Sequence, residues 1–320
     1  MKVNNKGFIQ NNFNILKATV LGFIGEDCMK YSASLAYYTI FSLGPILVLM
    51  ISLAGIFFGQ DAIQGKVFTE MKGLVGANAA QQIQEVIANL KLSGKSNIAL
   101  VISIVTLLIG STTVFGDIQN SINRIWHVRA KPKRGWVKLI TDRLLSSSLV
   151  IGLGFLLMVT LVVNGVILAM TDKLKIYFPD MTVFLMNAIN FVVSFGMVFI
   201  LFSIIFRTLP DVKIAWKTVR SGALFTTVLF IIGRFLIGFY VQYSGTESTY
   251  GAAGSLVLIL LWVYYTAAIL YFGAVYTREY ALAHGIPIKP AEYAVYVEEK
   301  EQEKTVHELP LTPKTEESTT

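Results

Sequence analysis

The chain has 320 residues, of which 54% are hydrophobic and 15% are charged, and its mean hydropathy is +0.61. Globular domains carry about 25% charged residues, so this composition excludes an ordinary water-soluble domain and indicates a membrane protein. The single cysteine, Cys28, excludes an internal disulfide, and the three scattered histidines (His127, His284 and His307) lack metal-site spacing.

Six long windows carry almost no charge: Tyr31–Gln60, Ser96–Gly116, Leu144–Thr171, Met181–Phe206, Ser221–Thr246 and Ser248–Thr277. A helix needs about 20 apolar residues to cross a core of ~30 Å. The apolar runs do not alternate and are too long for barrel strands. We predict an all-α polytopic membrane protein, a six-transmembrane-helix bundle with spans at about 33–58, 96–116, 144–170, 181–206, 221–244 and 252–277.

The cytoplasmic segment 1–30 is predicted to contain an amphipathic helix. Its apolar residues recur at helical spacing: Phe13, Leu16, Val20, Phe23 and Ile24. The pattern fits an interfacial helix on the membrane surface or a helix packed along the bundle. Glu26 and Lys30 are four residues apart and are expected to form a local ion pair. Because Met1–Asn14 is polar, we expect no cleaved signal peptide.

Ser42 and Pro45 fall near the middle of the first span. Proline frees the carbonyl four residues earlier, here that of Phe41. The break is either an ordinary kink or a broken helix that lends backbone polarity to a central site. In the external segment Asp61–Lys95, an apolar stripe predicts a second amphipathic helix, either a passive cap or a lid: Ile83, Val86, Ile87 and Leu90.

The basic residues indicate the topology. The segments before and between spans on one side of the bundle contain fifteen Lys and Arg residues, and the opposite loops contain six. The positive-inside rule then places the N- and C-termini in the cytoplasm. The same distribution explains the net charge of +7 without a nucleic-acid partner. Asp117 follows the second span and is predicted to lie at the cytoplasmic interface.

Arg234 is the only charged residue in the fifth window. A charge at the bilayer centre costs about 3 kcal/mol on insertion scales, and we find no carboxylate at its depth. Arg234 is either a structural arginine bound to carbonyls and water or an anion- or headgroup-binding residue. Snorkelling is disfavoured because the side chain is too short. We predict a central polar site at similar depth: Arg234, Ser42, Pro45, Asn190, Ser194, Tyr264 and Tyr265.

Residues 279–320 are predicted to be a cytoplasmic tail, acidic and disordered from about residue 298. The sequence contains no P-loop, dinucleotide fingerprint or metalloprotease helix. The loop acids Asp117, Asp142 and Asp211 have no ligand-like spacing. We therefore expect no enzymatic activity, no cofactor and no metal.

Several motifs together resemble the YihY/BrkB family of bacterial inner-membrane proteins: Ser34–Pro45, Asn120–Trp126, Leu209–Trp216, Tyr250–Ser255 and Leu261–Tyr265. The resemblance covers about Phe13 to Arg278 and implies a six-helix bundle in the bacterial plasma membrane. The family has carried the label ribonuclease BN, which the residues here do not support. Val275 stands where the family pattern has a glutamate, and Glu279 follows one turn later. This departure puts proton coupling through that carboxylate in doubt.

The sequence favours a transporter or permease for an anionic or amphipathic solute, with Arg234 as its central contact. The alternative is a non-transporting envelope protein that binds lipid or a protein partner through the basic loops. The expected partners are membrane lipid and an anionic solute, without nucleic acid, and the sequence assigns no oligomeric state.

Overall fold

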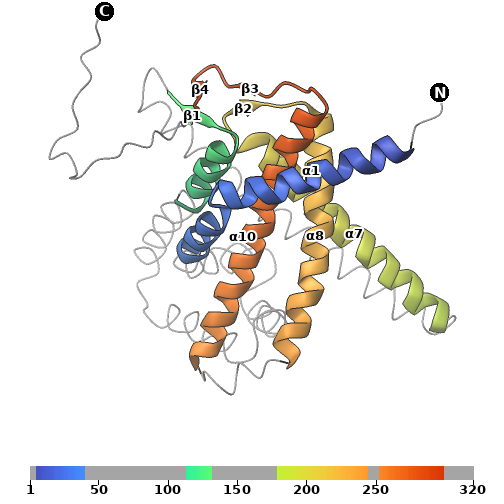
Figure 1. Ribbon diagram of the computed structural model, residues 1–320. Helices are drawn as coiled ribbons and strands as arrows, with labels where there is room; N and C mark the ends of the chain where they lie inside the picture. Colours follow the sequence, from blue (N-terminus) through green and yellow to red (C-terminus); the bar gives the residue numbers. More distant parts are fainter. Residues whose placement is uncertain (1–4, 40–112, 132–178, 244–251, 299–320) are drawn as a thin grey trace, which may run out of the picture.

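A computed structural model describes residues 5–39, 113–131, 179–243 and 252–298 (Figure 1). Three long helices dominate these residues: α7 (Pro179–Thr208), α8 (Trp216–Tyr243) and α10 (Ala252–Ala283). Each contains a stretch long and apolar enough to cross a membrane, namely Ala188–Thr208, Trp216–Ile237 and Ile259–Ala283. The fourth, fifth and sixth predicted spans are thus confirmed as apolar helices of spanning length. The third span, most of the first two and the external helix lie outside the described residues.

Three further helices lie beside α10. Helix α1 (Asn5–Gly25) is followed by helices at residues 28–39 and 113–125. The chain turns between α1 and helix 28–39 at Asp27, whose φ is 53°. The short strands β1 (Val128–Ala130), β2 (Val212–Lys213), β3 (Lys289–Pro290) and β4 (Ala294–Tyr296) gather at one end of the bundle (Figure 1). We call this the strand end.

The strands pair in two antiparallel ribbons, with Val128 opposite Tyr296 in β1–β4 and Val212 opposite Pro290 in β2–β3. Strands of two or three residues are too short to show an alternation of apolar and polar residues, so the all-α prediction did not include them. They fasten the segment after α10 to the exit of helix 113–125 and to the α7–α8 connection. The disorder predicted from about residue 298 lies outside the described residues.

Helix α1 has two apolar faces. Ile15 and Thr19 are buried, Gly22 lies against Val275 of α10, and the rings of Phe23 and Phe272 meet edge to face at 5.4 Å. The rest of the predicted stripe is exposed: Phe13, Leu16, Val20 and Ile24. Helix α1 therefore packs against the bundle through one face and crosses α10 near the strand end (Figure 1), whereas the stripe singled out in the sequence remains largely on its surface.

Helices α8 and α10 approach closely through reciprocal glycine–threonine contacts. A Cβ on Gly222 would overlap the Thr277 side chain, and a Cβ on Gly273 would overlap that of Thr226. Both hydroxyls donate within their own helix, Thr226 Oγ1 to Gly222 O at 2.7 Å and Thr277 Oγ1 to Gly273 O at 2.6 Å. Small residues at such contacts let helix backbones come together where no hydrophobic effect drives them.

A third contact continues this register toward the other end of the bundle. The Tyr265 hydroxyl occupies the space where a Cβ on Gly233 would lie. The three pairs Gly222–Thr277, Thr226–Gly273 and Gly233–Tyr265 advance together along antiparallel helices. Arg234 is therefore level with the Tyr264–Tyr265 pair, as the depth comparison from the sequence predicted.

Burial is concentrated toward the strand end. Fully buried side chains there include Phe206 of α7, Val219 of α8, Ile122 and Ile125 of helix 113–125, and Tyr271 of α10. An aromatic row connects the three long helices, with Phe202–Phe230 rings 6.0 Å apart and Phe230–Trp262 rings 6.1 Å apart. By contrast, Leu185, Phe191 and Val192 in the first half of α7 are exposed.

Replacing Gly273 by alanine tests the α8–α10 contact. The added methyl group meets the Thr226 side chain, so Gly273→Ala is expected to lower the free energy of unfolding by about 1–3 kcal/mol. The matched control is Gly196→Ala on α7, where a Cβ meets nothing within 4 Å. Unfolding of the detergent-solubilised variants measures the difference. Equal stability of the two variants would contradict the described packing.

Candidate functional site

Arg234 lies on α8 directly after Gly233, the residue that packs against Tyr265. The depth of Arg234 in the membrane can be estimated from the point, near the strand end, at which charged residues stop along α8 and α10. Charge-free sequence begins at Ser221 on α8 and ends at Thr277 on α10. Since about 20 helical residues cross the apolar core, its centre falls near Ile231 on α8 and near Ala268 on α10. Arg234 is then about 4.5 Å from the centre.

The Arg234 side chain is exposed. Among the residues that the structure describes, it forms no hydrogen bond or ion pair, so its five N–H donors have no partner there. A guanidinium at this depth needs dipoles, water or an anion to offset its desolvation. Arg234 thus presents a positive charge whose counterpart is not supplied by α1, α7, α8 or α10.

The other residues of the predicted central site do not form one cluster. Tyr265 lies against Gly233, beside Arg234, whereas the Tyr264 hydroxyl contacts Met29 Sδ of helix 28–39 at 3.4 Å. Adjacent residues on a helix point about 100° apart, which separates the two hydroxyls. Asn190 is exposed and accepts a 3.3 Å hydrogen bond from Ser194 within α7. Ser42 and Pro45 lie outside the described residues.

A second polar group, the Asp211 cluster, joins three elements at the strand end. The buried Asp211 carboxylate accepts hydrogen bonds from Gln119 Nε2 at 3.1 Å, Asn123 Nδ2 at 2.9 Å and the Tyr293 hydroxyl at 3.0 Å. In return, the Asp211 amide donates to Asn123 Oδ1 at 2.8 Å. A buried carboxylate is tolerated when hydrogen bonds replace its water. The cluster therefore fixes helix 113–125 to the α7–α8 connection and to the segment after α10.

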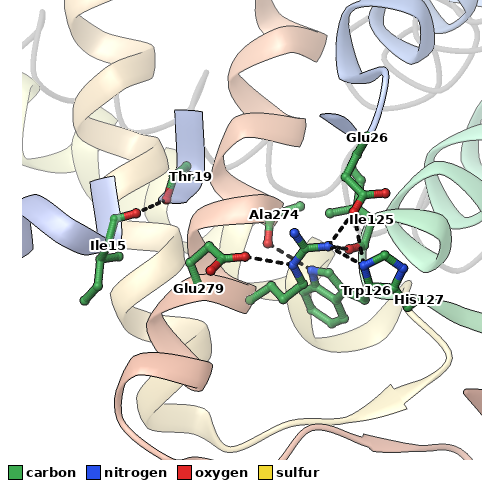
Figure 2. Close-up of polar contacts among 9 residues, drawn as sticks. Ile15, Thr19, Glu26, Ile125, Trp126, His127, Ala274 and Glu279 are labelled. Atoms are coloured by element: carbon green, nitrogen blue, oxygen red, sulfur yellow. Dashed lines mark hydrogen bonds and ion pairs between the residues drawn. The ribbon is translucent and has the colours of Figure 1, made fainter. Parts of the chain in front are cut away.

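A third group, the Arg278 cluster, lies where α1, helix 113–125 and α10 meet (Figure 2). Arg278 donates to Glu26 Oε1 at 2.9 Å and to Glu279 Oε1 at 3.1 Å, and also to the Ile125 carbonyl. Its guanidinium nitrogen is 3.0 Å from His127 Nε2, which is itself 3.1 Å from Glu26. Glu26 thus pairs with residues distant in sequence, so the predicted local pair with Lys30 is wrong.

The end of helix 113–125 is held in the same place. His127 has a φ of 54° and its amide bonds the Arg124 carbonyl, which ends the helix. The adjacent Trp126 is buried and donates from Nε1 to the Ala274 carbonyl of α10 at 2.9 Å (Figure 2). Burial, with help from the Glu26 charge, raises the pKa of the nearby Cys28 thiol to about 12. These contacts tie three segments of the chain together, which indicates a structural role.

Asp117 lies inside a helix and not at its end. Helix 113–125 continues for two turns beyond it, and Ser34 Oγ of helix 28–39 donates to its Oδ1 at 3.3 Å. Asp117 is therefore not at the end of its helix, and its predicted position at the cytoplasmic interface stays a prediction. The predicted second span ends before Asp117 because Asp117 is charged, whereas helix 113–125 continues past this residue.

Among the described residues, no group of three His, Cys, Asp or Glu side chains is arranged to hold a metal ion. The sequence pattern did not indicate the Asp211 and Arg278 clusters, although two of the family motifs, Asn120–Trp126 and Leu209–Trp216, contribute residues to them. Asn123 and Asp211 come from those two motifs. The two motifs could have suggested a contact. However, Asn123 and Asp211 are 88 residues apart in the sequence, so their spacing does not predict that they meet.

Removing the Asp211 carboxylate tests the cluster. Asp211→Ala leaves the buried donors of Gln119 and Asn123, and the hydroxyl of the more exposed Tyr293, without this acceptor, so we expect a loss of about 2–5 kcal/mol in unfolding free energy. The control is Glu292→Ala, which removes an exposed partner of Lys213 and is expected to cost under ~1 kcal/mol. Chemical unfolding in detergent measures both variants. Similar losses would show that the Asp211 contacts add little.

Comparisons with known proteins place the chain in a family. Residues 19–293 match the family described as virulence factor BrkB. A UPF0761 membrane protein of Pseudomonas paraeruginosa is 25% identical over 265 residues, which cover 79% of this chain and 59% of that protein. A UPF0761 membrane protein of Alteromonas mediterranea is 25% identical over 84% of this chain and 88% of its own length.

A ribonuclease-like protein, YfkH, of Bacillus subtilis is 26% identical over 76% of this chain and 86% of its own length. The chain spans about 59% of the length of the Pseudomonas relatives that it matches. No solved structure matches it. Because the family match covers most of the sequence and includes all three apolar helices, this chain is an integral membrane protein that belongs to the BrkB family.

Proposed function

We propose that the chain is a transporter or permease for an anionic or amphipathic solute and that Arg234 is the contact for its negative charge. The observation that carries the proposal is the exposed guanidinium within the apolar helix α8, which has no partner in the part of the chain that the structure describes. Ionisable residues are kept inside membranes mainly where they serve a pathway or a ligand. Tyr265, which packs beside Arg234 on α10, offers a hydroxyl and an aromatic ring to the same solute.

A second candidate function has its own support. Helix α1 has four exposed apolar side chains on either side of Lys17 in the sequence: Phe13, Leu16, Val20 and Ile24. An apolar stripe with a basic residue suits the interface of an anionic leaflet. A non-transporting envelope protein that binds lipid would use this face and would not require Arg234.

The proposal includes a location and an orientation. We place the protein in the bacterial inner membrane with the strand end toward the cytoplasm, because Arg124, Arg207, Lys213, Lys217 and Arg220 lie there. We also propose that it is not an enzyme. The ribonuclease-like name of one relative adds no catalytic group to the described residues of this chain.

Anion binding tests the role of Arg234. Purified protein is titrated with phosphate, citrate and octanoate, and the melting temperature is followed, because a ligand of the native state stabilises it. We expect at least one probe to stabilise the wild type and its apparent affinity to fall about 10-fold or more in Arg234→Gln. Arg234→Lys keeps the charge and should retain part of the affinity.

The matched control is Arg220→Gln, the same change of charge on the same helix at the strand end. It should leave the response to the anions unchanged. Uptake of the binding probe into liposomes that contain the protein then separates transport from binding. An Arg234→Gln variant with wild-type binding and uptake would rule out the proposed contact and leave lipid binding as the better interpretation.

The orientation has a separate test. A fluorescent-protein reporter fused after residue 298 is expected to fluoresce, and a periplasm-dependent phosphatase fused there is expected to be inactive, because basic loops stay in the cytoplasm. Fusions at residue 247, in the connection between the last two spans, should give the opposite pair of signals. Active phosphatase at residue 298 would reverse the assigned orientation.

A further inference from the structure

Arg234 lies on the face of α8 that packs into the bundle. It ends a row of residues at helical spacing on this face: Ala223, Thr227, Phe230 and Arg234. The first two are fully buried, and the Phe230 ring lies 6.0 Å from that of Phe202 on α7 and 6.1 Å from that of Trp262 on α10. Arg234 follows one turn later and is exposed. Neighbouring helices therefore cover the inward face of α8 as far as Phe230 and leave it uncovered at Arg234.

The facing row of α7 changes in the same way. Phe206 and Phe202, in the half of α7 nearer the strand end, are buried. On the same face farther from the strands, Phe195 is partly exposed and Phe191 is 53% exposed. Figure 1 shows α7 and α8 separating with distance from the strands. In the part of the chain that the structure describes, the two helices thus part beyond the contact of Phe202 with Phe230. We call the space between their inward faces the α7–α8 opening.

Helix α10 provides a third side of the opening. Tyr265 packs against Gly233 of α8, and Leu261, one turn farther from the strand end, is 37% exposed. The contact of Phe202 with Phe230 sets the antiparallel register, so Arg234 is level with about residue 198 of α7. Phe195 and Phe191 of α7 follow on the side away from the strands. The opening therefore has Arg234 and Tyr265 at its closed end and apolar side chains along its length.

The opening contains one positive charge. Arg234 is the only charged residue in the three charge-poor windows that form most of α7, α8 and α10. A single carboxylate neutralises one guanidinium and accepts two parallel N–H bonds from it. Citrate or a phosphate dianion would leave further negative charge unpaired among apolar side chains, which is unfavourable. The charge of the opening therefore selects a monoanion.

The apolar sides select the rest of the ligand. Phe191, Phe195 and Leu261 offer surface to a hydrocarbon chain, and each buried CH₂ group raises affinity about fourfold. A phospholipid is also a monoanion, but its glycerol and phosphate oxygens would have to lie among these side chains. A carboxylate is a smaller anionic head with fewer oxygens to satisfy.

We propose that the α7–α8 opening binds a single-chain carboxylate of the fatty-acid type. The carboxylate lies on Arg234, and the acyl chain lies between α7 and α8 along Phe195 and Phe191. The inference rests on the proposed function for its anion contact and names the substrate class. Because Phe202, Phe230 and Trp262 close the opening toward the strands, the chain points away from the strand end.

Ligands that vary chain length and charge separately test this assignment. The melting temperature of the full chain in detergent at pH 8 is followed with acetate, hexanoate, octanoate and decanoate, and with uncharged 1-decanol. We expect the apparent affinity of the carboxylates to rise about fourfold per CH₂ group. Decanoate should bind about 10-fold or more tightly than decanol, and this difference should disappear in Arg234→Gln.

Two matched phenylalanine variants locate the acyl chain. Phe191→Ala removes an exposed ring from the inward face of α7, whereas Phe235→Ala removes one from the outward face of α8, on the exposed row with Leu224 and Val228. Since both rings are exposed, both variants should fold. Phe191→Ala is expected to weaken decanoate about 5-fold or more and to leave acetate unchanged. Phe235→Ala should leave both affinities unchanged.

The outcomes separate this inference from the proposed function. Equal affinities for acetate and decanoate, both lost in Arg234→Gln, would overturn the acyl-chain site and leave the anion contact intact. Equal losses in Phe191→Ala and Phe235→Ala would also overturn it. Decanoate binding that is unchanged in Arg234→Gln would reject the proposed function together with the carboxylate contact. Displacement of decanoate by dihexanoyl phosphatidylglycerol at lower concentration would replace the fatty acid with a phospholipid.

Discussion

The close contact between α8 and α10 sets the relative positions of Arg234, Tyr265 and Tyr271 in the membrane region. It depends on two glycines, each of which receives a threonine from the opposite helix, and on Gly233, which receives the Tyr265 hydroxyl. Intrahelical hydrogen bonds satisfy both threonine hydroxyls, so the contact buries no unpaired donor there. In lipid, such packing replaces the hydrophobic effect as the source of association. A change of register by one turn would move Arg234 and Tyr271 relative to each other by about 5.4 Å.

The polar groups divide into two classes along the bundle. At the strand end, Asp211 and Arg278 each have several partners drawn from distant parts of the chain. These clusters hold distant segments of the chain together, because removal of one member leaves the polar groups of the others without a partner. Nearer the estimated centre, the Arg234 guanidinium and Asp117 Oδ2 have no partners among the described residues. The contrast is informative because the same chain satisfies its buried charges where only stability is required.

Membership of the BrkB family identifies an integral membrane protein, and the names of the matched relatives describe membrane proteins and a ribonuclease-like protein. A catalytic interpretation needs groups that activate water or a nucleophile. Among the described residues, Arg234 on α8 and Asp117 on helix 113–125 are charged side chains that lie within helices and away from the strand-end clusters.

Hydropathy and charge alone determined the fourth, fifth and sixth spans and placed Arg234 level with Tyr264 and Tyr265, because both conclusions depend only on counting residues along helices. Composition likewise determined the membrane class. Only the tertiary structure decided that Glu26 pairs with Arg278 and not with Lys30, and that Tyr264 and Tyr265 face different helices. It alone placed Asp117 beside Ser34, inside a helix that continues past it. The physical reason is that these positions depend on contacts between residues far apart in the chain, which local periodicity does not encode.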